Sequence, residues 1–380
     1  MPGSTAGVPV SVPAEHLPIT FVVGTGRCGT TLLSHILHRH PEVLGVGEFF
    51  AVLKAAARTF QVPAEEMDGR RLWDLLTTAS PEIDGLIESG LKPPEMSYPY
   101  APDGAGRFTP SGGVPLICHL LLPVLTDAPD TLFDRLAAEV PAWPRRPAAE
   151  QYRAFFAHLA GLLGRRAVVE CSAGSLLLVG QLQTLFPDAR FVHLYRDGPD
   201  CALSMSRHPA FRREVLALQA RAAARDVGLA TASLREIEDA MPDRFRGLLT
   251  PPYDARRFSR CPLPLDTFGR GYWAGMVCLG LEMLDAVPAR LHSSLSYEEL
   301  LTEPDHALTR LAGSLGLTAP PAWLAAARGL IDPSRRGRAA AELSAGELDA
   351  LRAACAPGTE ALAERGHVPP SVPVSRAESR

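Results

Sequence analysis

Short apolar runs alternate with longer amphipathic stretches along this chain. Four runs rich in β-branched and aromatic residues have the length and composition of buried strands: Ile19–Val23, Ala167–Cys171, Arg190–Tyr195 and 291–297. Stretches with apolar residues at helical spacing follow them, beginning with Thr30–His38 after the first run. Strands separated by helices predict an α/β fold, with a P-loop-like parallel sheet flanked by helices.

The segments between the predicted strands are long and largely helical. Residues 41–165 have the pattern of helical patches broken by loops, with a Pro- and Gly-rich surface loop at 98–115. Residues 251–267 have an irregular pattern. We expect a single domain at 18–366, between disordered tails at 1–17 and 367–380.

Composition and charge narrow the class of protein. The 380 residues are 46% hydrophobic and 21% charged, as in ordinary soluble globular proteins. The formal net charge of −4 argues against nucleic acid or a membrane surface as a partner. No signal-peptide pattern and no apolar run of membrane-spanning length occurs, so we expect a cytoplasmic protein; the pattern indicates no oligomeric state.

The cysteines and histidines do not have the spacing of a metal site. The seven cysteines are widely spread and include no Cys-x-x-Cys pair, which argues against both a disulfide scaffold and a zinc site. His35, His38 and His40 have no Cys or acidic partners at metal-ligand spacing. We therefore predict a protein that works without a metal.

The turn after the first strand nearly fits a phosphate-binding loop. Residues 24–31 are Gly-Thr-Gly-Arg-Cys-Gly-Thr-Thr, against the pattern G-x-x-x-x-G-K-[ST]. The N–H groups of such a loop and of the following helix bind anions. Thr30 stands where nucleotide-cleaving enzymes have the lysine that contacts the terminal phosphates. The loop therefore suits a 5′-phosphosulfate, whose sulfuryl and bridging oxygens Arg27 can bind.

The segment 26–31 resembles the corresponding loop of sulfotransferases that use 3′-phosphoadenylyl sulfate (PAPS). Cytosolic members of that family carry Pro-Lys-Ser-Gly-Thr-Thr there, and tyrosylprotein and many bacterial members carry Pro-Arg-Ser-Gly-Thr-Thr. Arg27 matches the basic position, whereas Gly26 and Cys28 replace the family's Pro and Ser. The resemblance implies PAPS as co-substrate, no metal, and six donor-binding loop residues: Gly26, Arg27, Cys28, Gly29, Thr30 and Thr31.

A second motif follows the third predicted strand. Arg196 comes directly after this strand, and Ser204 lies eight residues further on. In the resembling family this spacing binds the 3′-phosphate, and a guanidinium can grip a phosphate in a fork. Gly198 is an insertion relative to the family's Asn/Asp-Pro. Taken alone, Arg196 is as well explained by an ion pair with Asp197 or Asp200.

Three weaker elements also resemble the family. Arg335 and Arg336 lie in a late basic turn, which in the family closes over the 3′-phosphate; a solvated charge cluster is the alternative. Ser172 ends the stretch Glu-Cys-Ser, where many members have a lysine that contacts the transferring group. Because that lysine is absent, we expect Ser172 to donate to PAPS, and either Arg27 alone or an arginine from elsewhere in the chain to act as the electrophile. The stretch Tyr-Glu-Glu-Leu at 297–300 is interpreted as structural.

Sulfuryl transfer also needs a group that takes the proton of the attacking oxygen. Glu48 lies 21 residues after Arg27, a spacing that resembles the tyrosylprotein enzymes. Phe49 and Phe50 beside it favour partial desolvation, which raises the pKa of a carboxyl group. A helix-capping or solvated glutamate is the other interpretation. His119 is a competing base, although a histidine in an apolar run is more often a packed core residue.

These motifs together predict a sulfotransferase that moves the sulfuryl group of PAPS to a hydroxyl of an acceptor by in-line displacement. Helical insertions at 51–165 and 211–268 are expected to wall the acceptor pocket, and we expect a small hydroxylated molecule there. One alternative is a P-loop small-molecule kinase, which Thr30 disfavours. The other is a non-catalytic protein that binds PAPS or adenosine 3′,5′-bisphosphate, which the missing lysine favours.

Overall fold

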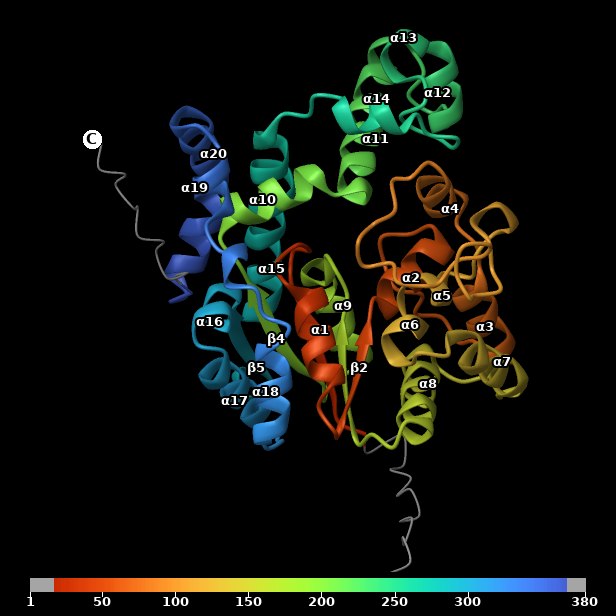
Figure 1. The fold of residues 1–380 in the computed structure, drawn as a ribbon, viewed down its shortest axis with the longest axis vertical. Helices are drawn as coiled ribbons and strands as arrows, with labels where there is room; N and C mark the ends of the chain where they lie inside the picture. The colour runs from red at the N-terminus through yellow and green to blue at the C-terminus, as the bar shows by residue number, and fades with distance from the viewer. Residues whose placement is uncertain (1–16, 368–380) are drawn as a thin grey trace, which may run out of the picture.

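A five-stranded parallel sheet lies at the centre of the molecule (Figure 1). The computed structural model describes residues 17–367. The strands are β1 (Ile19–Val23), β2 (Val43–Gly47), β3 (Ala167–Cys171), β4 (Arg190–Tyr195) and β5 (His292–Ser296). Their order is β2-β3-β1-β4-β5, and every neighbouring pair is parallel. The α/β fold predicted from the alternating pattern is confirmed.

Strand β2 is the one strand of this sheet that the sequence pattern missed. Its sequence, Val-Leu-Gly-Val-Gly, holds two glycines, which are depleted in strands. All five residues are nevertheless buried, because α1 (Thr30–His38) packs against this edge of the sheet. The segment 41–165 therefore contributes an edge strand as well as helices.

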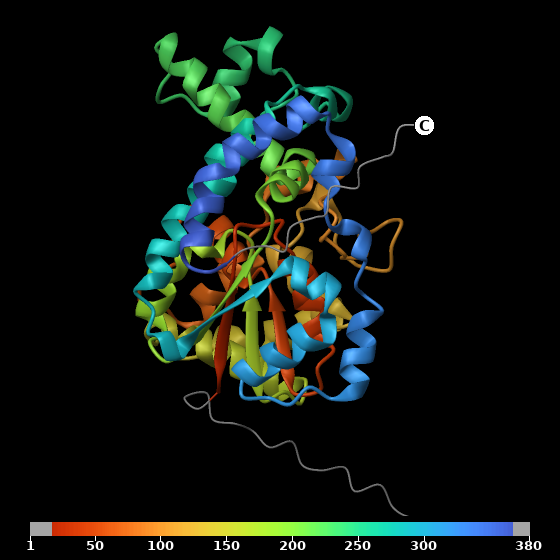
Figure 2. The same ribbon diagram turned by 90° about the vertical axis from the view of Figure 1, so that its left-hand side faces the viewer.

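Helices cover both faces of the sheet (Figures 1 and 2). Between β2 and β3 they are α2 (Phe49–Ala57), α3 (Gly69–Thr77), α4 (Pro81–Glu88), α5 (Leu116–Leu120), α6 (Leu122–Leu125), α7 (Pro129–Glu139) and α8 (Ala148–Leu162). Between β3 and β5 they are α9 (Val179–Leu185), α10 (Gly198–Arg207), α11 (Pro209–Asp226), α12 (Leu234–Ala240), α13 (Pro242–Phe245), α14 (Ala255–Arg260) and α15 (Gly275–Asp285). After β5 they are α16 (Tyr297–Thr302), α17 (Pro304–Ser314), α18 (Pro321–Arg328), α19 (Arg338–Glu342) and α20 (Ala345–Glu364).

Shorter helical turns lie between these elements. The 3₁₀ turns are η2 (Pro110–Gly112), η3 (Val140–Ala142), η4 (Ser175–Leu178), η6 (Ala289–Leu291) and η7 (Pro333–Arg335), and η5 (Thr267–Ala274) is a π-helix. The helix predicted at Thr30–His38 is confirmed. The segment 251–267, expected to be irregular, contains α14, whose first turn is capped by the Asp254 side chain.

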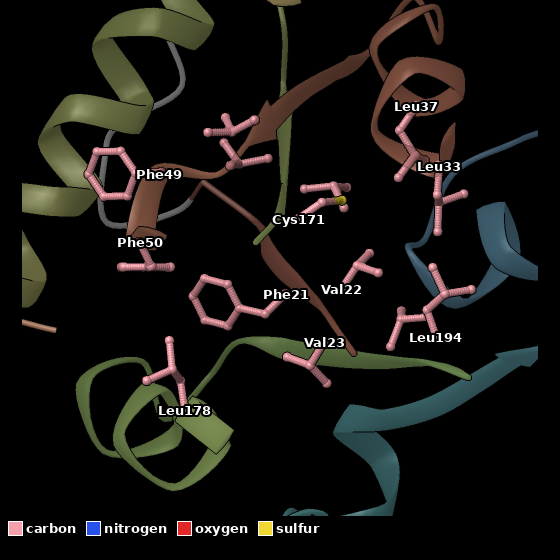
Figure 3. Packing of buried hydrophobic residues seen from close by; sticks show 14 of the residues in the cluster. Phe21, Val22, Val23, Leu33, Leu37, Phe49, Phe50, Cys171, Leu178 and Leu194 are labelled. Carbon is pink, nitrogen blue, oxygen red and sulfur yellow. The ribbon is translucent and has the colours of Figure 1, made fainter. Parts of the chain in front are cut away.

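The main core is built around Phe21 of β1 (Figure 3). Its ring centroid lies 5.6 Å from that of Phe50 and 5.2 Å from that of Phe186. Val22, the next residue, points to the other face of the sheet, where Leu33 of α1 packs. Because Phe49 and Phe50 at the start of α2 are buried, the residue before them, Glu48, is fixed against the sheet.

A second, smaller core lies in the group of helices drawn in green at the top of Figure 1. It joins α11 to α12, α13 and α14 and buries Leu216, Ile237, Phe245 and Phe258. The segment predicted at 211–268 as a pocket wall therefore contains a lobe with apolar packing of its own.

The predicted tails lie outside the described residues, apart from one residue at each end. Leu17 is 2% exposed and belongs to the main core, and His367 Nε2 lies 3.1 Å from Ser294 Oγ of β5. Within residues 17–367 no single helix has the length and apolar composition to cross a membrane, while one bent pair of segments, Leu116–Leu125 with Pro129–Ala142, meets those two criteria jointly.

Candidate functional site

Most of the predicted site residues lie at the carboxyl edge of the sheet, because they follow strands, whereas Arg335 and Arg336 come from the turn between α18 and α19. Strand β1 leads into the glycine loop, β2 into Glu48, β3 into Ser172, β4 into Arg196 and β5 into Tyr297. In a parallel sheet these strand ends meet at one edge, where α/β proteins bind their ligands. The topology therefore brings together motifs that are far apart in the chain, from the glycine loop after β1 to Tyr297 after β5.

The glycine loop turns sharply between β1 and α1. Gly29 has φ 107°, and a Cβ there would overlap the ring of Tyr297, so only glycine fits. The loop ends at the N-terminus of α1, where Thr30 is buried and Thr31 is partly exposed. The first N–H groups of a helix have no partner within the helix, which makes this loop a favourable place for an anion.

Arg27 and Glu48 have backbone conformations that residues with side chains rarely adopt. Their φ angles are 56° and 60°, and Arg58 is the one other non-glycine residue of the described chain with positive φ. Such conformations cost about 1 kcal/mol or more and concentrate at functional sites. The structure thus holds the proposed electrophile and the proposed base in fixed, unfavourable turns.

The side chain of Arg27 points toward the second motif. Its Nε donates to Ser204 Oγ at 3.2 Å, and its Nη1 lies 3.8 Å from Glu95 Oε2. Cys28 faces the other way: it is 1% exposed, and a Cβ on Gly24 would overlap its sulfur. Of these two predicted donor-binding residues, Arg27 lines the cavity described below and Cys28 does not.

Arg196 is almost fully buried and joins the glycine loop to the basic turn. It is 7% exposed, and its Nη1 donates to the main-chain oxygen of Arg27 at 3.0 Å. Its Nη2 donates to the main-chain oxygen of Arg335 at 3.0 Å. The guanidinium lies 4.5 Å from the ring centroid of Tyr297, while its buried Nε has no hydrogen-bond partner among residues 17–367.

The ion pair with Asp200, the alternative explanation for Arg196, is also present. The Nη2 atom lies 3.5 Å from Asp200 Oδ2. Gly198, the insertion in this motif, packs closely on Trp273, since a Cβ there would lie 2.7 Å from the indole ring. The insertion therefore has a packing reason, and Arg196 still faces the site.

A cavity of about 570 Å³ joins the two motifs. Arg335 of the late basic turn lines it, whereas Arg336 lies outside its lining. Its basic and hydroxyl-bearing lining residues are Arg27, Thr30, Thr31, His35, Ser97, Arg196, Ser204, Arg207, His208, Tyr297, Arg335 and Arg338, and its acidic ones are Glu95, Asp200 and Asp332. Five arginines against three carboxylates make the cavity suited to an anion with more than one charged group.

Glu48 stands beside the glycine loop, outside the lining of this cavity. It precedes α2, and its two carboxylate oxygens accept from the main-chain N–H of Ala173 at 3.0 and 3.1 Å. Ala173 in turn lies against Gly26, because a Cβ on Gly26 would be 3.5 Å from that of Ala173. Burial raises the pKa of Glu48 to about 8, and the charge of Glu170 adds to the shift.

Ser172 is turned away from the cavity. It is fully buried, and its hydroxyl donates to the Glu170 carboxylate. Burial raises the pKa of Glu170 to about 7. Lys54 of α2 lies in the field of Glu48 and Glu170, and burial lowers its pKa although these carboxylates favour its charged form. A cation is therefore present near Glu170, supplied by a helix rather than by the strand end.

His119 is part of the core and not of the site. It is 0% exposed, its Nδ1 lies 2.8 Å from the Tyr100 hydroxyl, and its Nε2 lies 3.2 Å from Asp84 Oδ1. The structure instead reveals Glu95 and His208 in the cavity, with His208 Nε2 3.0 Å from Glu95 Oε2. Neither residue belongs to a local motif, so the sequence pattern gave no signal for them.

Two further features of the described residues bear on the kind of site. Within residues 17–367, no three His, Cys, Asp or Glu side chains are grouped so as to hold a metal ion. A second cavity of about 560 Å³ lies on the lobe of α12 to α14, and none of the predicted site residues lines it.

Comparison with known proteins supports the resemblance seen in the sequence. Residues 18–98 match the model of the sulfotransferase family, and this segment contains β1, the glycine loop and Glu48. The predicted resemblance to sulfotransferases is confirmed for this part of the chain. A search of curated proteins finds no significant match.

Solved sulfotransferase structures align with most of the chain at low identity. The sulfotransferase domain from the curacin biosynthetic pathway is 14% identical (89% of this chain, 97% of that domain, TM-score 0.44). The sulfotransferase domain of the Synechococcus olefin synthase is 15% identical, and the alignment covers 89% of this chain and 94% of that domain with a TM-score of 0.44. A sulfotransferase from Alicyclobacillus acidocaldarius is 18% identical, and the alignment covers 92% of this chain and 96% of that protein with a TM-score of 0.36.

Proposed function

We propose that this protein is a sulfotransferase that transfers the sulfuryl group of PAPS to a hydroxyl of a small acceptor molecule. The observation that carries the proposal is the direct contact between the two motifs. Arg196 donates to the main chain of Arg27, 169 residues away, and Arg27 donates to Ser204. Two anion-binding motifs that meet in one cavity are suited to a ligand with an anionic group at each end.

The charged lining of the cavity supports a donor nucleotide of this kind. The glycine loop, the N-terminus of α1 and Arg27 would hold the 5′-phosphosulfate. Arg196, Ser204 and Arg335 would hold the 3′-phosphate. The Nε of Arg196 is a buried donor with no hydrogen-bond partner within the described chain. Because buried donors are nearly always hydrogen-bonded, a phosphate oxygen would be a suitable acceptor for it.

The chemistry follows from the residues at the phosphosulfate end. The acceptor oxygen attacks sulfur in line, the bond from sulfur to the bridging oxygen breaks, and adenosine 3′,5′-bisphosphate leaves with the electron pair. Arg27 stabilises the charge that develops on the sulfuryl and bridging oxygens. Thr30 in place of lysine suits this donor, because there is no β,γ-phosphate pair to neutralise.

We propose that Glu48 is the general base that accepts the proton of the acceptor hydroxyl. Two features support this role: a pKa of about 8, close to the pH at which a base must work, and a fixed turn beside the glycine loop. The rings of Phe49 and Phe50 are buried in the core, so they hold Glu48 in place rather than contact an acceptor.

The proposed function is tested by measuring whether the protein converts PAPS to adenosine 3′,5′-bisphosphate. The protein is incubated with PAPS, EDTA and a panel of hydroxylated small molecules, and the release of adenosine 3′,5′-bisphosphate is followed by chromatography. We expect release that depends on the acceptor and is unaffected by EDTA. Binding of PAPS without release on any acceptor would favour the non-catalytic alternative, and Mg²⁺-dependent ATP turnover would favour the kinase.

A further inference from the structure

The carboxylate of Asp200 joins α10 to the basic turn before α19. It is 3% exposed, its Oδ2 accepts from the main-chain N–H of Gly337 at 2.8 Å, and its Oδ1 accepts from that of Ala339 at 2.8 Å. The two donors lie 137 and 139 residues further along the chain. A buried carboxylate with both oxygens bound by main-chain N–H groups fixes the position of that turn on α10.

The same carboxylate orients Arg196. Its Oδ2 lies 3.5 Å from Arg196 Nη2, which also donates to the main-chain oxygen of Arg335 at 3.0 Å. Asp200 therefore contacts both halves of the proposed 3′-phosphate site: the strand-end arginine and the turn that carries Arg335. An acid inside an anion-binding cavity requires such a reason, since a free carboxylate would repel a phosphate.

We propose that Asp200 is a positioning residue for the 3′-phosphate of the donor nucleotide. This inference rests on the proposed function and assigns a role within its donor site. Asp200 acts through Arg196 and through the turn at 332–339, because both of its oxygens are occupied by Gly337 and Ala339. It thereby determines how strongly the protein distinguishes a nucleotide with a 3′-phosphate from one without it.

A different role for Asp200 would have the opposite effect. If it served only to neutralise Arg196, its removal would leave a free guanidinium and bind the 3′-phosphate more tightly. If it positions Arg196 and the turn, its removal releases both and binds the 3′-phosphate more weakly. The sign of the change separates the two roles.

The experiment compares adenosine 3′,5′-bisphosphate with AMP, which differ only in the 3′-phosphate. The Kd of each is measured by calorimetry for the unchanged protein, Asp200→Asn and Asp200→Ala. We expect the ratio of the two Kd values to fall by about tenfold or more in Asp200→Ala, while AMP binding stays within about twofold. Asp200→Asn keeps one acceptor oxygen and should retain part of the ratio.

A matched control is available in the lobe of α12. Glu238 is 4% exposed and also accepts from two main-chain N–H groups, those of Leu248 at 3.0 Å and Leu249 at 3.3 Å. Glu238→Gln tests what the loss of such a carboxylate does to folding alone, and we expect it to leave the ratio unchanged. Thermal unfolding is recorded for every variant, and if Asp200→Ala does not fold, Asp200→Asn decides.

An unchanged or larger ratio in the folded Asp200 variants would overturn this inference and leave the proposed function intact. A failure of the unchanged protein to bind adenosine 3′,5′-bisphosphate would overturn the proposed function, and the role of Asp200 with it.

Discussion

Glu95 Oε2 lies 3.8 Å from Arg27 Nη1, so a carboxylate faces the guanidinium that we assign to the sulfuryl group. Burial raises the pKa of Glu95, but the hydrogen bond with His208 and the charge of Arg27 outweigh it, and the net shift is downward. Glu95 is therefore ionised at neutral pH and competes with an anionic ligand for Arg27.

Glu95→Gln should bind adenosine 3′,5′-bisphosphate more tightly, by about two- to fivefold, because the competing charge is partly exposed and partly screened. Calorimetry at low and moderate salt measures the effect. Glu88→Gln, an exposed glutamate at the end of α4, is the control and should change nothing. Weaker binding by Glu95→Gln would show that Glu95 supports the donor site instead of competing with the ligand.

Arg196→Ala should weaken binding of the bisphosphate by about 30-fold or more, since it removes a buried guanidinium that contacts the glycine loop and the basic turn. It should also lower the unfolding temperature, because Asp200 loses its buried partner. Arg190→Ala, at the opposite end of the same strand, is the matched control. Equal affinities of the two variants would argue against Arg196 as a ligand-binding residue.

Glu48→Gln should leave binding of the bisphosphate nearly intact and lower kcat by about 10²-fold or more, as loss of a general base does. The pH dependence gives a second readout. With a pKa of about 8, the carboxylate is ionised only toward alkaline pH, so kcat of the unchanged protein should rise with pH up to about 8. Full activity of Glu48→Gln, with the same pH profile, would exclude Glu48 as the base.

The raised pKa of Glu48 also predicts a pH dependence of stability. The folded state keeps the proton up to pH about 8, whereas the unfolded chain releases it near its ordinary value of 4.5. Between these values the unfolded state binds fewer protons, so the contribution of this group to the free energy of unfolding falls as pH rises. Denaturant unfolding from pH 5 to 8 should show a smaller decline for Glu48→Gln; an equal decline would contradict a neutral carboxyl at this position.

Cys28→Ser should lower stability without changing donor affinity, although it restores the residue typical of sulfotransferases. The side chain is 1% exposed and packs against Gly24, so a hydroxyl there loses its hydration, which costs about 1–3 kcal/mol where its hydrogen bonds are incomplete. Thermal unfolding and calorimetric titration measure the two effects separately. Tighter nucleotide binding by Cys28→Ser would mean that this side chain reaches the ligand.

The parts of the site that could be predicted are those carried by short local patterns. Arg27 lies in a glycine turn after an apolar strand, and Arg196 with Ser204 follows another, so strand ends and spacing were enough. Glu95 and His208 could not be predicted in this way. They are 113 residues apart in the chain, come from a loop and a helix boundary, and meet only through the tertiary fold.

Side-chain direction was the second feature that the sequence could not specify. Cys28 and Ser172 lie in the right segments, yet the first faces the core and the second donates to Glu170. Which way a residue in a turn points depends on what packs around it. Strand β2 could not be predicted for a related reason. Its two glycines are untypical of a strand, and the segment is stabilised by its burial under α1, which the sequence pattern does not show.

Calorimetric titration with adenosine 3′,5′-bisphosphate in EDTA, beside titrations with ATP with and without Mg²⁺, tests the central claim most directly. A site built from Arg27, Arg196 and Ser204, with Thr30 in the lysine position, should bind the bisphosphate tightly without metal and ATP much more weakly. Absence of bisphosphate binding together with Mg²⁺-dependent binding of ATP would contradict it and would favour a kinase.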